Sequence, residues 1–344
     1  MTELDWSSFY GWTIVSLLTA IVSFLSCSRA TAIAKKSGMI AQPGERQSHE
    51  VPTPTGGGLG IMFSIVVTSL GLQLIMPVPG FWWQNMLPGI LLLVIVGWRD
   101  DRHPVSATVR LLVQLAVSLW LLGFGWLQFS VSDLAWFASV VVAMVWLMNL
   151  YNFMDGSNGM AGFQGVFAGL LMAVLFQING HVAMALLALS VAAACAGFLP
   201  LNFPGARVFM GDVASVPLGF IFASFAVYGM QTGSIGVPLS ILIMSVFIID
   251  ATLTLFTRVM SGEQWYTAHT QHVYQRLIIR GWSHRKVLIA YQAINVILVI
   301  PAIVLAKVYP QYAIVTAGLV LLLLGTCWYF ANRRLGMPVK VELK

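Results

Sequence analysis

The stretch from Val182 to Pro200, VAMALLALSVAAACAGFLP, carries no charged side chain and decides the class of fold. A helix that crosses the hydrocarbon core of a bilayer needs about 20 apolar residues. The chain around this stretch is similar: 58% of its 344 residues are hydrophobic, only 9% are charged, and the mean hydropathy is +0.85. Soluble domains average about 25% charged residues. This composition excludes an ordinary soluble enzyme, a disordered chain and a nucleic-acid binder, despite a net charge of +6.

Similar apolar runs recur along the whole chain. They predict an all-α, polytopic integral membrane protein with about 11 transmembrane helices. The first run follows Glu3 and Asp5 with no basic residue before it, so we expect an uncleaved helix rather than a secretory signal. The predicted spans are 11–28, 56–76, 86–98, 109–127, 133–149, 160–178, 182–200, 213–230, 236–257, 288–306 and 310–331.

The basic residues predict the orientation of these spans. If the N-terminus lies outside, 17 of the 18 Lys and Arg residues fall in loops on one side of the membrane, and only Lys307 falls on the other. The positive-inside rule makes the crowded side cytoplasmic. We therefore expect the N-terminus outside and the C-terminus in the cytoplasm.

The titratable residues gather on the same predicted side, which holds eight of the 12 acids and five of the six histidines. A secondary transporter more often places its polar site near the bilayer midplane. The distribution favours an enzyme with one transmembrane catalytic domain, 1–344. Its active site is expected in the cytoplasmic loops 29–55, 99–108, 150–159, 201–212 and 258–287. The three cysteines lie in apolar runs and show no metal-ligand spacing.

Two acidic segments carry candidate chemistry. Asp100 and Asp101 end a short span, and adjacent carboxylates repel one another unless a cation lies near. Arg99 and Arg102 flank them, so a solvated loop with ion pairs and a metal or phosphate site are both open. Asp212 stands at the mouth of a later span after Gly211, where it suits a helix N-cap, a ligand, or both.

Asn149, Asn152 and Asp155 are spaced three apart, so on a helix they share one face. Oxygen ligands from Asn and Asp suit hard cations such as Mg²⁺. A transmembrane helix has no packing reason to end in this way, which favours a functional role. The Gly- and Pro-rich segment 43–58, taken alone, is best interpreted as a helix-entry loop.

The longest cytoplasmic segment contains a basic stripe, defined as His269, His272, Arg276 and Arg280. On a continuous helix these residues share one face. A phosphate- or diphosphate-binding role is favoured, and an amphipathic helix on anionic lipid is the alternative. Zinc is disfavoured because no third ligand is evident. Asp250, inside span 236–257, is interpreted as a structural polar partner, with Arg258 as one candidate, rather than as part of a lipid groove.

Taken in order along the chain, these segments resemble the polyprenyl-phosphate N-acetylhexosamine-1-phosphate transferase family, from about residue 40 to 285. The matching motifs are Pro-Thr-Pro-x-Gly-Gly, the Asp-Asp loop, Asn-x-x-Asn-x-x-Asp-Gly, Val-Phe-Met-Gly-Asp and the His-rich last loop. The His-x-x-His-x-Tyr-Gln-Arg form at 269–276 looks most like the subgroup that initiates O-antigen synthesis. The chain departs from the family pattern at Ala41, Gly44, Thr55 and Asn158.

The resemblance implies transfer of an N-acetylhexosamine-1-phosphate from a UDP-sugar to undecaprenyl phosphate, with release of UMP, in a bacterial inner membrane. It implies Mg²⁺ (or Mn²⁺) on Asp212 and Asn152, and a catalytic role for Asp100 and Asp101 near the lipid phosphate. Membrane lipid and a homodimeric partner are compatible with it, and nucleic acid is not expected. A transporter or flippase for lipid-linked sugars is the alternative function. The implied substrate-binding residues are Asn149, Asp155, Asn158, Asn202, Arg207, His269, His272 and Arg276.

Overall fold

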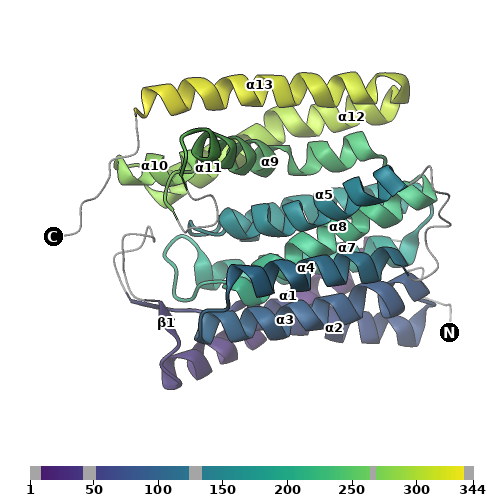
Figure 1. Cartoon of the computed structure of the whole chain (residues 1–344). Helices are drawn as coiled ribbons and strands as arrows, with labels where there is room; N and C mark the ends of the chain where they lie inside the picture. The colour runs from purple at the N-terminus through teal and green to yellow at the C-terminus, as the bar shows by residue number, and fades with distance from the viewer. Residues whose placement is uncertain (1–8, 42–51, 124–133, 264–268, 337–344) are drawn as a thin grey trace.

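The computed structural model describes residues 9–41, 52–123, 134–263 and 269–336, and these form a bundle of roughly parallel and antiparallel helices (Figure 1). Parts of the expected active-site loops, 42–51 and 264–268, lie outside the described residues. A two-stranded antiparallel ladder pairs Ile40 with Pro54. The elements are α1 (Phe9–Lys36), β1 (Ile40–Ala41), β2 (Thr53–Pro54), α2 (Gly58–Ile75), η1 (Phe81–Met86), α3 (Leu87–Arg102), α4 (Ala107–Gly123), α5 (Leu134–Phe153), α6 (Met160–Ile178), α7 (Val182–Asn202), α8 (Asp212–Thr232), α9 (Val237–Met260), α10 (Val273–Ile279), α11 (His284–Ile294), η3 (Asn295–Val299), α12 (Ile300–Val308), η4 (Pro310–Tyr312) and α13 (Ala313–Arg334).

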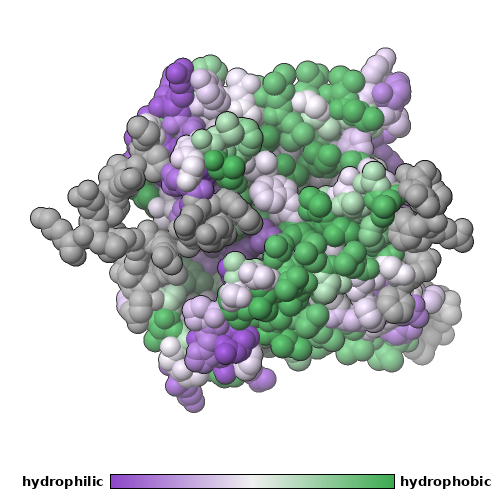
Figure 2. All heavy atoms as spheres, viewed as in Figure 1, coloured by the Kyte–Doolittle hydropathy of each residue, from purple (hydrophilic) through white to green (hydrophobic). Residues whose placement is uncertain are grey.

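Ten helices of the described residues are long and apolar enough to cross a membrane, and α4 is a shorter apolar helix. The chain is therefore an all-α, multi-pass membrane protein, as the sequence predicts. The count of 11 spans and the orientation of the termini stay predictions. Figure 2 shows hydrophobic residues across the middle of one face of the bundle and hydrophilic residues toward its ends, the pattern expected of a bilayer-embedded surface.

Several spans run beyond their predicted bounds, and the first and third differ most. The third was expected at 86–98, but a π-helical turn, η1, extends it to Phe81 and α3 runs on to Arg102. The first continues two turns beyond the expected residue 28 to Lys36, so that Arg29, Lys35 and Lys36 are helical. Basic residues suit this last turn because they face the negative end of the helix dipole.

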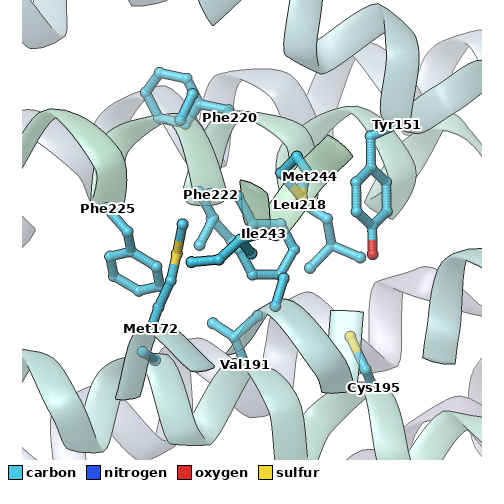
Figure 3. Close-up of a cluster of buried hydrophobic side chains, with 14 of the residues drawn as sticks. Tyr151, Met172, Val191, Cys195, Leu218, Phe220, Phe222, Phe225, Ile243 and Met244 are labelled. Carbon is cyan, nitrogen blue, oxygen red and sulfur yellow. The ribbon is translucent and has the colours of Figure 1, made fainter. Parts of the chain in front are cut away.

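Helices α7 and α8 form the buried centre of the bundle, whereas α1 and α13 are mostly exposed at its periphery. Close packing of α1 against its neighbours depends on glycine. A Cβ added to Gly60 would overlap the backbone of Cys27, and one added to Gly197 would overlap Ala20. Small residues allow such close approach between transmembrane helices, where packing rather than the hydrophobic effect drives association. Figure 3 shows the core, in which Tyr151, Phe222 and Met244 converge.

One end of the bundle collects the elements that carry the candidate residues. Helices α3, α5 and α7 finish there and α8 begins there, with β1 and α10 at the same end (Figure 1). We call it the polar end. By the distribution of basic residues it is the end that the sequence predicts to be cytoplasmic.

Candidate active site

The polar end is organised around the contact between the last turn of α3 and the first turn of α8. A Cβ added to Gly97 would lie 2.5 Å from the carbonyl oxygen of Asp212, so only glycine permits this approach. The Asp101 carboxylate accepts hydrogen bonds from the backbone N–H of Asp212 at 3.0 Å and of Val213 at 3.4 Å. These N–H groups have no partner within the helix, and Asp101 caps them. Asp101 thus fixes the start of the helix that carries Asp212.

Asp100 and Asp212 share one cation, Arg110 from the first turn of α4. The Arg110 guanidinium nitrogen Nη1 lies 3.0 Å from Asp100 Oδ2 and 3.4 Å from Asp212 Oδ2. The other oxygen of Asp100 accepts the backbone N–H of Val105 at 2.5 Å. The side chains of Asp100 and Asp212 remain partly exposed, at 12% and 23%. Two carboxylates from different helices therefore face one accessible point.

Asn152 and Asp155 complete the acidic cluster from the end of α5. The Asn152 side chain hydrogen-bonds the Asp212 carboxyl group, and the backbone of Gly211 hydrogen-bonds Asp155. Enclosure, together with the carboxylates of Asp212 and Asp101, holds the pKa of Asp155 well above its usual value of 3.8. Asn149 and Asn152 lie in the last turns of α5, but α5 ends at Phe153, so Asp155 does not share their helical face as the spacing predicts.

The acidic cluster, defined as Asp100, Asp101, Asp155 and Asp212, has the chemistry of a Mg²⁺ site but not a closed cage. No group of three His, Cys, Asp or Glu side chains is arranged to hold a metal among the residues that the structure describes. Mg²⁺ commonly takes only one or two carboxylates and keeps waters and substrate phosphates as its other ligands. The accessible oxygens of Asp212, Asn152 and Asp100 fit that requirement.

Two polar residues of α4 belong to this site although the sequence did not single them out. Arg110 is one, and Gln114, one turn further on, is the other. The Asn149 amide donates to Gln114 Oε1 at 2.7 Å, and the Gln114 amide donates back at 3.4 Å. A charged side chain within an apolar run is costly and is therefore a candidate for function, and this rule could have identified Arg110 from the sequence.

Asn202 joins the two loops that flank the acidic cluster. It is 5% exposed; its Oδ1 accepts the backbone N–H of Gly159 at 2.6 Å and its Nδ2 donates to the carbonyl of Val208 at 3.0 Å. Asn158 reinforces this junction by donating to the carbonyl of Pro204 at 3.1 Å. Arg207, on the loop between them, is exposed. The structure thus gives Asn202 a scaffolding position and leaves Arg207 open to solvent.

The basic stripe does not form one helical face, and that expectation is wrong. Helix α10 begins at Val273, so His269 and His272 precede it. His272 is buried with its ring stacked 6.1 Å from Phe153, between centroids, and burial lowers its pKa below 6.5. Its ring centroid lies 4.8 Å from that of His269. Both histidines therefore lie beside the end of α5.

The arginines of the stripe turn away toward α13. Arg276 donates to the side chain and carbonyl of Asn332 and to the carbonyl of Gly336. Arg280 donates to the carbonyls of Arg334 and Leu335. Burial lowers the pKa of Arg276. Both guanidinium groups thus satisfy carbonyls at the end of a helix, where a cation is favourable.

The fold and this cluster define a multi-pass membrane protein with an acidic site at one end of its bundle. A family model described as glycosyl transferase family 4 matches residues 83–230. A Bacillus subtilis protein described as a probable undecaprenyl-phosphate N-acetylglucosaminyl 1-phosphate transferase is 31% identical over 85% of this chain and 83% of its own length. The chain belongs to this family, the polyprenyl-phosphate N-acetylhexosamine-1-phosphate transferases that its motifs resemble.

More distant relatives cover the chain equally well. A decaprenyl-phosphate N-acetylglucosaminephosphotransferase of Mycobacterium tuberculosis is 27% identical over 83% of this chain and 80% of its own length. A phospho-N-acetylmuramoyl-pentapeptide-transferase of Staphylococcus aureus is 28% identical over 83% of this chain and 96% of its own length. The similarity thus extends well beyond the segment matched by the family model.

Proposed function

We propose that this protein transfers an N-acetylhexosamine-1-phosphate from a UDP-sugar to undecaprenyl phosphate and releases UMP. The observation that carries the proposal is the acidic cluster, with Asp100 and Asp212 facing one point around Arg110 at the end of an apolar bundle. The names of the relatives support a prenyl phosphate acceptor. Such a reaction would start a cell-surface glycan at a bacterial inner membrane, with the site in the cytoplasm. O-antigen is one such product, and the relatives' names point more generally to cell-wall glycans.

In this reaction an oxygen of the acceptor phosphate attacks the β-phosphorus of the UDP-sugar. A new P–O bond forms, the bond from the β-phosphorus to the bridging oxygen breaks, and UMP leaves with that oxygen. A phosphate monoester has a second pKa of about 6, so the attacking group is largely ionised at neutral pH without a strong base. Positioning and charge neutralisation then dominate the work of the protein.

Asp212, Asn152 and Asp100 would hold Mg²⁺, or Mn²⁺ in its place. The bound ion would neutralise the charge of the diphosphate. Arg110 would restrain the two carboxylates and offset their repulsion. Asp101, whose carboxylate is engaged with the start of α8, is assigned to positioning Asp212 rather than to touching substrate.

The remaining candidates surround this cluster. We assign Asp155, Asn158 and the exposed Arg207 to the nucleotide, and His269 and His272 to the sugar or diphosphate. Asn149, Asn202 and Arg276 are assigned to holding the elements around the substrate, since their side chains bond within the protein. The active site of this single catalytic domain would be formed by loops 29–55, 99–108, 150–159, 201–212 and 258–287.

A cavity of about 320 Å³ between α5, α8 and α9 offers a place for the prenyl chain. Its lining runs along α5 from Trp136 to Leu150, a length of roughly 21 Å at 1.5 Å per residue. Leu150 lies at the same end of α5 as Asn152, so an apolar chain in this cavity would carry its phosphate toward the polar end of the bundle. Its lining is mostly apolar and aromatic, which suits an isoprenoid.

The test is purified protein with undecaprenyl phosphate, Mg²⁺ and a panel of UDP-sugars, assayed for UMP. We expect Mg²⁺-dependent release of UMP with at least one UDP-N-acetylhexosamine, and loss of release in Asp212→Asn despite normal folding. Transport of a lipid-linked sugar without UMP formation would instead identify a transporter or flippase. Wild-type activity of Asp212→Asn would overturn the assignment of the metal.

A further inference from the structure

Asp250 is a buried carboxylate that the proposed reaction does not use. It lies in the membrane-spanning helix α9, is 3% exposed, and has no ion-pair partner among the described residues. The candidate partner Arg258 pairs instead with Glu263, with Nε 3.2 Å from Oε2. A carboxylate within a membrane is costly and persists only when other groups satisfy it. The ion pair of Asp250 with Arg258 that the sequence offered is therefore not formed, and other groups must satisfy the carboxylate.

Five hydrogen-bond donors surround Asp250 instead. Its carboxylate accepts the Tyr291 hydroxyl at 2.6 Å, the Trp328 indole N–H at 3.1 Å and the Thr254 hydroxyl at 3.3 Å. It also accepts the backbone N–H groups of Val273 at 3.0 Å and Tyr274 at 3.4 Å. These donors come from α9, α10, α11 and α13, so one side chain joins four helices.

The two backbone contacts fix the start of α10. This helix has seven residues, and helices shorter than about 12 residues are marginal on their own. Its position must therefore come from tertiary contacts. Asp250 supplies the contact at its first turn, in the same way that Asp101 caps α8.

The first turn of α10 touches the end of α5. The Tyr274 hydroxyl donates to the carbonyl of Phe153 at 2.8 Å. Gly156 lies so close to that hydroxyl that a Cβ would overlap it. The ring of Tyr274 stacks 5.8 Å from that of His272, between centroids. The segment 153–156, which carries Asp155, rests on Tyr274.

We infer that Asp250 is a positioning residue that acts through Tyr274 on the segment 153–156 and on His272. The effect on catalysis rests on the proposed function, whereas the effect on local order does not. Replacement of Asp250 should disturb binding of the UDP-sugar, to which Asp155 and His272 are assigned, more than binding of the lipid acceptor. A purely structural role would affect both substrates through the amount of folded protein.

The experiment is a double-mutant cycle of Asp250→Asn and Tyr274→Phe. The first weakens the anchor of α10 and the second removes the hydrogen bond to Phe153. If they act along one path, their effects on kcat/KM for the UDP-sugar will be clearly less than multiplicative, because contacting residues on one network are not additive. Ser245→Ala is the matched control: it is buried in α9 and its hydroxyl has no hydrogen-bond partner among the residues that the structure describes. We expect it to leave both KM values unchanged.

Hydrogen exchange tests the same inference without any substrate. We expect faster backbone exchange in 153–157 for Asp250→Asn than for wild type or Ser245→Ala. Multiplicative effects in the cycle, or unchanged exchange in this segment, would overturn the inference. Faster exchange in a protein that releases no UMP would retain the structural link while refuting the proposed function.

Discussion

The carboxylate of Asp101 accepts the backbone N–H of Asp212 at 3.0 Å, although 111 residues separate the two in the chain. Two neighbouring acids thus have different surroundings. Both oxygens of Asp101 accept backbone N–H groups at the start of α8, whereas Asp100 uses one oxygen for the Val105 N–H and the other for Arg110. The two acids are neighbours in the sequence, but Asp101 holds the start of α8 in place and Asp100 is the one proposed to take part in the reaction.

This division predicts unequal effects of two amide substitutions. Asn caps a helix about as well as Asp, whereas Ala costs about 0.5–2 kcal/mol at such a position. Asp101→Asn should therefore retain most activity, and Asp101→Ala should lower both the Tm and kcat. Asp100→Asn should lower kcat far more than Asp101→Asn, with little change in Tm. UMP release and thermal unfolding in detergent measure both quantities. Equal inactivation by the two amides would show that Asp101 itself takes part in the reaction.

Replacement of Arg110 should strengthen metal binding but slow turnover. Arg110→Gln removes the positive charge between Asp100 and Asp212, so Mn²⁺ should bind more tightly to the substrate-free protein. The same change leaves the carboxylates unrestrained and should lower kcat by roughly tenfold or more, equivalent to about 1.4 kcal/mol. Electron paramagnetic resonance of free Mn²⁺ measures the affinity.

Arg110→Lys is the control for this experiment. It keeps the charge but replaces the Nη1 atom, which contacts both carboxylates, with an ammonium group on a side chain of different length and geometry. Mn²⁺ affinity should therefore stay near that of wild type while kcat falls. Unchanged affinity and turnover in both variants would remove Arg110 from the site.

The lowered pKa of His272 predicts that the folded protein becomes less stable in acid. Burial lowers its folded-state pKa below 6.5, so between that lower value and 6.5 the unfolded chain binds more protons than the folded chain. Its contribution to stability is present above pH 6.5 and is lost as the pH falls toward the folded-state pKa. His272→Gln should reduce the fall in Tm between pH 7 and pH 5, measured by intrinsic fluorescence. An identical pH profile in the variant would contradict this prediction.

Asn202 should affect stability before it affects binding. Asn202→Ala leaves the N–H of Gly159 and the carbonyl of Val208 without their partner, and each unsatisfied buried group costs about 1–3 kcal/mol. We expect a lower Tm and a lower kcat/KM together. A raised KM for the UDP-sugar at unchanged Tm would identify direct contact with substrate.

Hydropathy was sufficient to predict most of the membrane fold, and where it failed the reason is local. The span predicted at 160–178 is α6 with the same bounds. The third span was placed too late because Gln84 and Asn85 interrupt the apolar run of η1. Asn85 is nevertheless buried, with its amide donating to the carbonyl of Leu121 at 3.1 Å. A hydropathy average cannot anticipate a polar side chain whose amide N–H is bonded by a neighbouring helix.

The candidate site was less predictable because its details depend on contacts between distant residues. The acidic segments and the Asn and Asp spacing in the sequence pointed to Asp100, Asn152, Asp155 and Asp212, which the structure brings together. The basic stripe failed because α10 begins only at Val273, where the backbone N–H bonds Asp250, 23 residues earlier in the chain. Arg110 was overlooked as a site residue since its role depends on the turn between α3 and α4. Spacing along one helix cannot reveal either relationship.

The contacts of Arg276 and Arg280 with the end of α13 have a consequence for the order of synthesis. The ribosome makes α10 before α13, yet Arg276 of α10 bonds Asn332 of α13, and Asp250, which bonds the first turn of α10, accepts the indole N–H of Trp328. A nascent chain that has not yet produced α13 lacks these supports, even when all of its acidic residues are in the membrane. The site should therefore form only after α13 has inserted, so that an incomplete chain has no activity.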